Sequence, residues 1–253
     1  MKTLSFHIAT LCAALVLGSA GSFAATTDNS QLTYRVGEKT FAAHVEISKS
    51  PAKATVFIIH DWDGLTDYEK SRAKMLSDLG FDAIAIDLFG VDTKLKNRDD
   101  YKRETGALYK DRTEFRARMS AAIDAGKKSG AKNEKIVIIG YCFGGAATLE
   151  AARAGFKADG FVSFHGGLRT PDGQNYRQTT APVLLLHGSA DPVSGMEDLA
   201  SLINQLKDAN VPHDAQIFGG ARHSFTVRGS RDYDAQADQK SWNALQQFLA
   251  RLD

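Results

Sequence analysis

The sequence has few cysteines, no excess charge of either sign and no long apolar run. It contains 31 lysines and arginines against 30 aspartates and glutamates, a net charge of +1. So balanced a chain offers no electrostatic basis for binding nucleic acid or an anionic membrane surface, and we expect neither as a partner. Repeats and low-complexity tracts are missing as well, which leaves an ordinary folded domain as the class to consider.

The apolar stretch near the N-terminus is too short to cross a membrane. It covers residues 8–17, against the ~20 residues that a spanning helix needs. Lys2 precedes it and small residues ending at Ala24 follow it, a pattern typical of a cleaved secretory signal peptide. We therefore predict a signal peptide over residues 1–24, a single domain over residues 25–253, and a periplasmic or secreted protein that leaves the membrane after cleavage.

Cleavage would also decide which cysteine remains. The chain has two, Cys12 and Cys142, and the first lies within the predicted signal peptide. A mature chain with Cys142 alone cannot form an internal disulfide. An unpaired thiol is unusual in an oxidising compartment, so Cys142 needs a chemical reason to be there.

Apolar runs alternate with amphipathic segments through the rest of the chain. We expect strands at 40–48, 54–60, 81–89, 135–141, 160–166, 182–188 and 213–219. We expect helices at 67–79, 102–128, 143–154, 195–209 and 235–251. Near-continuous apolar strands separated by helices predict an α/β fold with a mostly parallel central sheet and helices on both faces. Ligands of such sheets bind beyond the carboxyl ends of the strands.

Cys142 directly follows one of these strands and opens a helix. It is flanked by Gly140 and Gly144, in the pattern of the nucleophile elbow G-x-S-x-G with sulfur in place of oxygen. Small residues are needed on both sides because the turn at the nucleophile is sharp. The pattern predicts a nucleophilic cysteine, and the alternative is an inert buried thiol.

Two later strand ends offer partners for this nucleophile. Asp191 lies in the loop after residues 182–188, and His223 follows the last strand. Taken singly, Asp191 fits a turn or helix-capping residue somewhat better than a catalytic acid, and His223 fits a loop histidine as well as a catalytic base. Their order after Cys142, however, is the nucleophile–acid–histidine order of α/β-hydrolases.

The motifs around these residues resemble those of the dienelactone hydrolase family. They are GYCFGG (140–145), HGSADP (187–192), RHSF (222–225) and the C-terminal segment 234–249, and the likeness extends over about residues 38–252. The resemblance implies the α/β-hydrolase fold and a Cys142–His223–Asp191 triad that cleaves small carboxylic esters or lactones through an acyl-thioester. It also implies an oxyanion hole made by the backbone N–H groups of Trp62 and Phe143, and no cofactor.

Two positions depart from the family pattern. Asp61 stands where the family has a glutamate that draws the proton from the thiol, so we name Asp61 as a candidate for thiol activation, although it could instead shape its loop. The family arginine four residues after the histidine is Val227 here, with Arg228 beside it. We therefore name Arg228 and His165 as candidate substrate-pocket residues. Arg103, Arg112 and Arg116 could also hold a substrate carboxylate, but helix-surface positions are the simpler reading.

Other interpretations remain open at this point. His60, His165 and His187 end strands at one edge of the predicted sheet but show no metal-ligand spacing, so we expect no metal. A thioesterase or peptidase would use the same residues. A non-catalytic exported binding protein, or an amidotransferase-like fold with a similar cysteine elbow, is also possible. We expect a monomer that acts on a small molecule.

Overall fold

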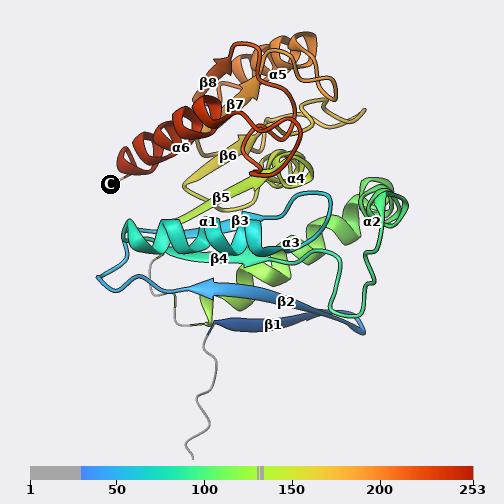
Figure 1. Cartoon of the computed structure of the whole chain (residues 1–253), viewed down its shortest axis with the longest axis vertical. Helices are drawn as coiled ribbons and strands as arrows, with labels where there is room; N and C mark the ends of the chain where they lie inside the picture. The colour runs from blue at the N-terminus through green and yellow to red at the C-terminus, as the bar shows by residue number, and fades with distance from the viewer. Residues whose placement is uncertain (1–29, 130, 132–133, 253) are drawn as a thin grey trace, which may run out of the picture.

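In the computed structural model, which describes residues 30–129, 131 and 134–252, one sheet runs through the whole molecule (Figure 1). Its eight strands lie in the order β1-β2-β4-β3-β5-β6-β7-β8. The strands are β1 (Gln31–Val36), β2 (Lys39–Glu46), β3 (Thr55–Ile59), β4 (Asp82–Ile86), β5 (Ile136–Tyr141), β6 (Gly160–Phe164), β7 (Val183–Gly188) and β8 (His213–Phe218). The predicted signal peptide, residues 1–24, lies outside the described residues.

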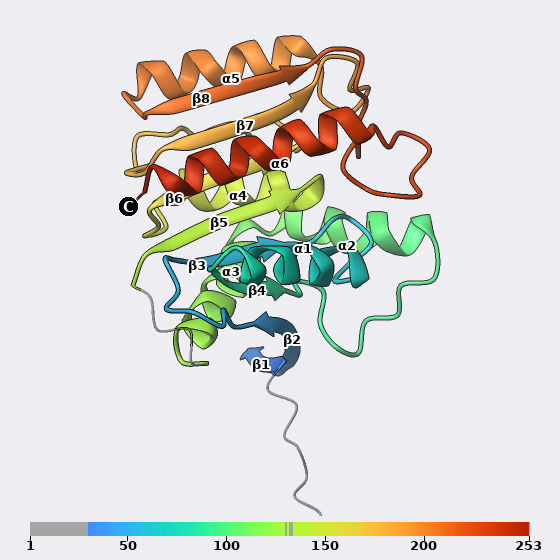
Figure 2. The ribbon, with the colours of Figure 1, turned by 60° about the vertical axis from the view of Figure 1, so that its left-hand side comes forward.

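The sheet is mostly parallel, as its apolar runs predict. All neighbours from β4 to β8 pair in parallel, whereas β1 and β2 form an antiparallel pair at one edge. Every residue of β3, β4, β5, β6 and β7 is buried, because helices cover both faces. In Figure 2 the arrowheads of β5, β7 and β8 point the same way, so their carboxyl ends share one edge.

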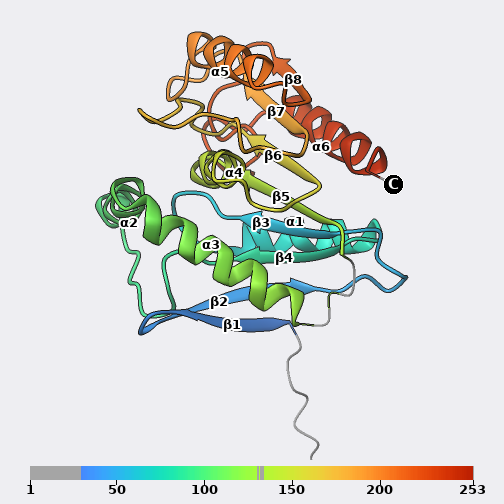
Figure 3. The same cartoon turned by 180° about the vertical axis from the view of Figure 1, so that it is seen from behind.

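Helices divide between the two faces of the sheet. They are α1 (Asp67–Asp78), α2 (Arg98–Lys110), α3 (Arg112–Lys127), α4 (Phe143–Arg153), α5 (Met196–Asp208) and α6 (Ala235–Ala250). Helices α1 and α6 lie in front in Figure 1, and α3, α4 and α5 lie in front in Figure 3. A separate hydrophobic core lies on each face of the sheet. Neighbouring residues of β3 point to opposite faces, as the period of two in a strand requires. Phe57 packs into the core under α3, α4 and α5, and Ile58 packs into the core under α1 and α6. No helix in the described part of the chain has the length and apolar character needed to span a bilayer.

Two elements differ from the sequence prediction. Strand β1 was not predicted, because as an edge strand it buries only Tyr34 fully and so lacks an apolar run. The helix predicted over 102–128 is two helices, α2 and α3, which meet at Asp111. The side chain of Asp111 accepts the N–H of Glu114 and caps α3, a D-x-x-E pattern of the kind that marks a helix start.

Candidate active site

Cys142 sits in a sharp turn between β5 and α4. Its backbone angles, φ 51° and ψ −109°, lie in a region that side-chain-bearing residues rarely adopt. The turn brings backbones so close that a Cβ on Gly140 would lie 2.0 Å from the carbonyl oxygen of Gly144, and one on Gly144 would lie 2.1 Å from that of Ile59. Both positions therefore require glycine, and the strand-turn-helix geometry of an elbow is present.

The structure brings Cys142, His223 and Asp191 into one hydrogen-bonded chain. His223 Nε2 lies 2.8 Å from Cys142 Sγ, and His223 Nδ1 lies 2.8 Å from Asp191 Oδ2. The other oxygen of Asp191 accepts the backbone N–H groups of Val193 and Ser194 at 2.8 and 3.2 Å. Burial acts to raise the pKa of Asp191, but the hydrogen bond and charge of His223, together with the N–H groups of Val193 and Ser194, outweigh it, so the pKa lies below its usual value. An ionised Asp191 therefore orients the imidazole toward the sulfur.

Asp61 reaches the same sulfur despite its short side chain. Burial raises the pKa of Asp61 to about 7, against the lowering effect of its hydrogen bonds to Trp62 and to the thiol of Cys142. Burial, followed by the charge and hydrogen bond of Asp61, holds the pKa of Cys142 well above its usual value. Cys142 therefore carries a thiol, not a thiolate, while Asp61 is ionised and nothing else is bound.

The two backbone N–H groups expected to form an oxyanion hole both lie beside this pair. The N–H of Phe143, at the start of α4, donates toward Cys142. The N–H of Trp62 donates to Asp61 Oδ1 at 2.5 Å, so its hydrogen is already engaged by a carboxylate. The indole of Trp62 packs edge-on against Tyr101 and under the guanidinium of Arg98.

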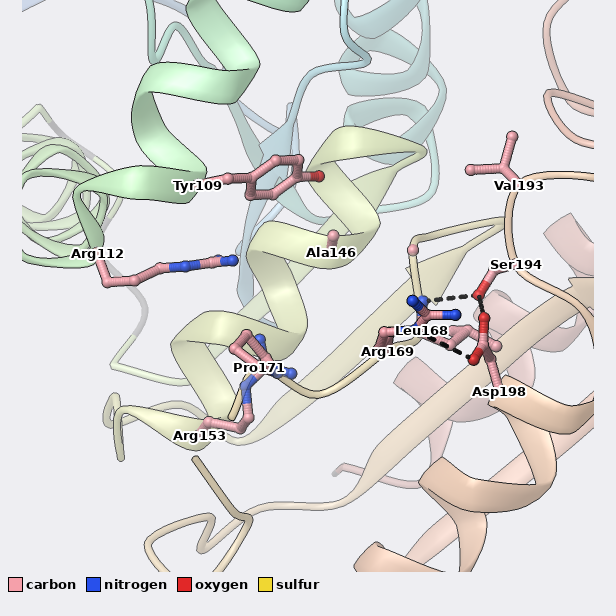
Figure 4. Close-up of a pocket in the computed structure, with 11 residues that line it drawn as sticks. Tyr109, Arg112, Ala146, Arg153, Leu168, Arg169, Pro171, Val193, Ser194 and Asp198 are labelled. Atoms are coloured by element: carbon pink, nitrogen blue, oxygen red, sulfur yellow. Dashed lines mark hydrogen bonds and ion pairs between the residues drawn. The ribbon is translucent and has the colours of Figure 1, made fainter. Parts of the chain in front are cut away.

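A cavity of about 470 Å³ lies between α4 and the loop that carries Asp191 (Figure 4), although Cys142, Asp191 and His223 do not line it. Ala146, one turn along α4 from Cys142, lies in its wall, as do Val193 and Ser194 from the Asp191 loop. The remaining lining residues are Tyr109, Arg112, Arg153, Gly167, Leu168, Arg169, Pro171 and Asp198.

The cavity is positively charged on one side. Arg112 and Arg153, together with Arg116, surround the fully buried carboxylate of Glu150, with N–O distances of 3.1, 2.9 and 2.6 Å respectively. Three cations around one anion leave an excess of positive charge. A fourth arginine, Arg169, is exposed at the rim, 3.6 Å from Asp198.

Sequence reasoning named Arg112 and Arg116 but missed Arg153 and Arg169. A signal for Arg153 was available: Cys142, Ala146, Glu150 and Arg153 follow one another at intervals of four, four and three residues. Such spacing places them on one face of a helix. No comparable signal marks Arg169, which lies in the loop after β6.

The predicted pocket residues His165 and Arg228 lie elsewhere. His165 is 0% exposed and lies beneath the elbow, where its Nδ1 accepts the backbone N–H of Cys142 at 3.2 Å. Arg228 is exposed in the loop beyond His223 and does not line the cavity. Arg103 is also on the surface, paired with Asp100 and Glu104. None of these three side chains forms part of the cavity wall.

The strand-end histidines make separate backbone contacts. His60 Nε2 accepts the N–H of Leu88 at 3.0 Å, and His187 Nε2 lies 2.8 Å from the carbonyl oxygen of Ser194. Within residues 30–129, 131 and 134–252, no three His, Cys, Asp or Glu side chains are grouped so as to hold a metal ion.

Comparisons with known proteins match most of the chain. Residues 41–252 match the model of the dienelactone hydrolase family. Carboxymethylenebutenolidase of Pseudomonas putida is 26% identical over 215 residues, which cover 80% of this chain and 89% of the relative. The human carboxymethylenebutenolidase homolog is 26% identical over 78% of this chain and 82% of its own.

Solved structures also match the fold. The crystal structure of a dienelactone hydrolase-like promiscuous phosphotriesterase from metagenomic libraries superposes with a TM-score of 0.81 and 30% identity, covering 88% of this chain and 97% of that chain. The predicted α/β-hydrolase architecture is confirmed.

Proposed function

Because the chain belongs to the dienelactone hydrolase family, we propose that it hydrolyses small carboxylic esters or lactones through an acyl-thioester on Cys142. The observation that carries this proposal is the pair of 2.8 Å contacts that join Cys142 Sγ to His223 and His223 to Asp191. A nucleophile, a base within hydrogen-bond reach and a group that orients the base are the parts that covalent catalysis requires.

The reaction follows from these contacts in two halves. In acylation the thiol proton moves to His223 Nε2, the sulfur attacks the carbonyl carbon, and His223 returns that proton to the departing oxygen as the carbon–oxygen bond breaks. A lactone releases no fragment, because its alcohol oxygen stays in the acyl group. In deacylation His223 takes a proton from water, the resulting hydroxide attacks the thioester, and Cys142 recovers its proton as it leaves.

Asp61 acts on the thiol before the attack. Its ionised carboxylate accepts the S–H hydrogen bond and opposes thiolate by its charge. If the carboxylate holds that proton transiently before passing it to His223, the pair is thiolate plus carboxylic acid, and the neutral acid holds the Trp62 N–H less strongly. That N–H then becomes free for the negative oxygen of the tetrahedral intermediate, where one such donor is worth about 3 kcal/mol.

The charge of the cavity favours acyl groups that carry a carboxylate. Arg112 and Arg169 present guanidinium groups to the cavity, and guanidinium binds carboxylate through two parallel hydrogen bonds. Tyr109 and Leu168 line the same space with apolar surface. The proposed substrates are therefore small esters or lactones with an acidic substituent a few bonds from the reacting carbonyl.

Export is the second part of the proposal. It rests on the N-terminal pattern of one lysine, a short apolar run and small residues before Ala25. The check is the intact mass of protein recovered from the extracytoplasmic fraction of an expression host. A chain that begins at Ala25 supports the proposal, and a chain found only in the cytoplasm at full length contradicts it.

The decisive experiment for the chemistry is intact-mass detection of an acyl adduct. Protein is quenched in acid during turnover of a panel of activated esters, lactones, thioesters and short peptides, and the adduct is mapped by peptide sequencing. Acylation of Cys142 and loss of hydrolysis in Cys142→Ala support the proposal. Full activity in the alanine variant contradicts it, and turnover of thioesters or peptides alone assigns the same chemistry to another substrate class.

A further inference from the structure

His165 is a buried histidine that the proposed reaction leaves without a role. It follows β6 directly and is 0% exposed, so it cannot touch a substrate in the cavity. Its backbone φ is 36°, in the left-handed region that residues with a side chain seldom enter. A strained backbone next to a second strained residue, Cys142, indicates that the position of this ring is imposed by its surroundings.

The protonation of the His165 ring is fixed by its partners. The backbone N–H of Cys142 is shared between the carbonyl oxygen of Phe164 at 3.0 Å and Nδ1 of His165 at 3.2 Å, and a backbone N–H can only donate. Nδ1 is therefore the acceptor, so in the neutral ring the proton is on Nε2, which donates to Thr226 Oγ1 at 2.7 Å. Burial, assisted by the charge of His223, keeps the pKa of His165 well below its usual value, consistent with a neutral ring.

The two partners of His165 belong to the two reacting segments. Cys142 carries the sulfur, and Thr226 lies three residues after His223 in the same loop. That loop is held on its other side by α1: Tyr68 Oη lies 2.6 Å from Thr226 Oγ1, and Arg72 donates to the carbonyl oxygen of Thr226 at 3.0 Å. The ring of His165 also meets the ring of His223 edge-on, with 5.4 Å between centroids.

We propose that His165 is a positioning residue that bridges the nucleophile elbow to the loop of His223 and so sets the contact between Cys142 Sγ and His223 Nε2. The role presupposes the cysteine hydrolase reaction described above. Loss of either half of the bridge allows the elbow and the loop to move apart. Since transfer of the thiol proton depends on the 2.8 Å contact, the rate of the chemical step falls while substrate affinity is kept.

Two substitutions separate the halves of the bridge. His165→Asn keeps an acceptor near the position of Nδ1, and asparagine tolerates positive φ, but it cannot reach Thr226. His165→Gln keeps a donor near the position of Nε2 but loses the side-chain acceptor, so the N–H of Cys142 donates to the carbonyl oxygen of Phe164 alone. Thr226→Val removes the hydroxyl at constant shape, and Thr226→Ser restores it. Each loss of one hydrogen bond is expected to lower kcat roughly tenfold with KM unchanged.

The double variants give the sharper test. His165→Asn has already broken the link to Thr226, so adding Thr226→Val should cost only what the loss of the contact between Tyr68 Oη and Thr226 Oγ1 costs, which Tyr68→Phe measures separately. His165→Gln keeps that link, so adding Thr226→Val should cost a further factor of about ten. Ser163→Ala is the matched control, since it removes another buried hydroxyl from β6, one that has no hydrogen-bond partner among the residues that the structure describes. The control should retain kcat.

Three readouts are needed on each variant: kcat and KM with p-nitrophenyl acetate, the rate of Cys142 alkylation by iodoacetamide, and the midpoint of thermal unfolding. A fall in kcat and in alkylation rate, with the predicted pattern in the double variants, supports the bridge. A lower unfolding temperature with kcat unchanged, a rise in KM alone, or additive losses in His165→Asn/Thr226→Val overturns it.

The two proposals fail in different ways. Absence of ester hydrolysis by the wild-type protein contradicts the proposed function, while the alkylation rates still report whether His165 aligns Cys142 with His223. If the His165 variants do not fold, the variants Thr226→Val and Thr226→Ser test the same link. A kcat that falls in the valine variant and is kept in the serine variant shows that the hydroxyl of Thr226, and not the shape of its side chain, is required.

Discussion

The carboxylate of Asp61 accepts the backbone N–H of Trp62 at 2.5 Å, and the same carboxylate interacts with the thiol of Cys142. One acidic side chain thus holds both the expected nucleophile and an expected oxyanion donor. Because burial places the pKa of Asp61 at about 7, its charge changes within the ordinary working range of pH. The state of the site is therefore expected to depend on this one proton.

Asp61→Asn should move the pH profile of Cys142 alkylation toward lower pH. Burial acts first to raise the pKa of the thiol, and the charge of Asp61 adds to it. Removing that charge at nearly constant shape leaves only the burial effect, so thiolate forms at lower pH. The measurement is the iodoacetamide rate between pH 5 and 10 without substrate. A profile identical to that of the wild type would show that Asp61 does not act on the sulfur.

The same substitution should stabilise the fold at high pH but not at low pH. The folded-state pKa of Asp61, about 7, lies above the reference value of 3.8, so the wild type loses unfolding free energy as the pH rises from 4 to 8. The shift of roughly three units corresponds to at most about 4 kcal/mol. Asp61→Asn has no charge to bury and escapes this loss.

Urea denaturation at pH 4.5 and pH 8 measures that difference. Asp208→Asn, at an exposed position at the end of α5, is the control, and its stability relative to the wild type should be nearly the same at both pH values. If Asp61→Asn gains nothing between the two pH values, Asp61 is not a buried charge in the folded protein.

Asp191→Asn should keep the fold and lower kcat by about three to four orders of magnitude. The amide can no longer accept the Nδ1–H of His223 as a carboxylate does, so the imidazole turns or takes the wrong tautomer. Stopped assays with p-nitrophenyl acetate, alongside the circular dichroism of the folded variant, give the measurement. A loss smaller than tenfold would move the orienting role to another acid, with Asp198 and Asp214 the next to substitute.

Arg112→Gln and Arg169→Gln should each weaken the binding of acidic substrates and leave the binding of neutral substrates unchanged. Both side chains line the cavity, and loss of a charge-assisted hydrogen bond of about 1.5–3 kcal/mol raises KM by roughly ten- to a hundredfold. The comparison is between hemisuccinate and acetate esters of the same phenol. The acetate, which has no carboxylate, should keep its KM within twofold, and an equal effect on both esters would contradict anion binding.

Arg116→Gln provides the matched control for these arginines. Arg116 contacts the same buried Glu150 at 2.6 Å but does not line the cavity. Its loss should therefore lower stability without distinguishing the two esters. A selective rise in KM for the hemisuccinate in this variant would show that the effect comes from Glu150 and not from direct contact with substrate.

The sequence predicts the residues at strand ends better than those in helices. Cys142, Asp191 and His223 could be placed together because parallel strands deliver their carboxyl ends to one edge, whatever the packing in between. Asp61 could be named as a candidate partner of the thiol only from the family resemblance, because its contact with the sulfur depends on side-chain reach. Only part of the cationic wall was named: Arg112 was a candidate, whereas Arg153 was missed because its position is typical of a helix surface until the burial of Glu150 is known.

His165 is a residue whose position at a strand end gives the wrong prediction. Its place at a strand end predicts exposure to ligand, as for its neighbours along the edge. The positive φ at His165 instead turns the ring inward beneath Cys142. Backbone conformation at a single non-glycine residue leaves no pattern in the sequence, so the difference between a wall of the pocket and a support below it could not be foreseen.

The order of the strands has a consequence for how the molecule acquires activity. The elbow follows a strand in the middle of the sheet, whereas Asp191 and His223 follow β7 and β8 at one end of it, and the contact between His223 and Cys142 joins residues 81 positions apart. Pairings over such distances in the chain form late, because loop closure must precede them. During refolding, hydrolytic activity should consequently appear only when β8 docks, and we expect it to lag behind the helix signal measured by circular dichroism. The time course of hydrolytic activity during refolding therefore reports when the last strand of the sheet has paired.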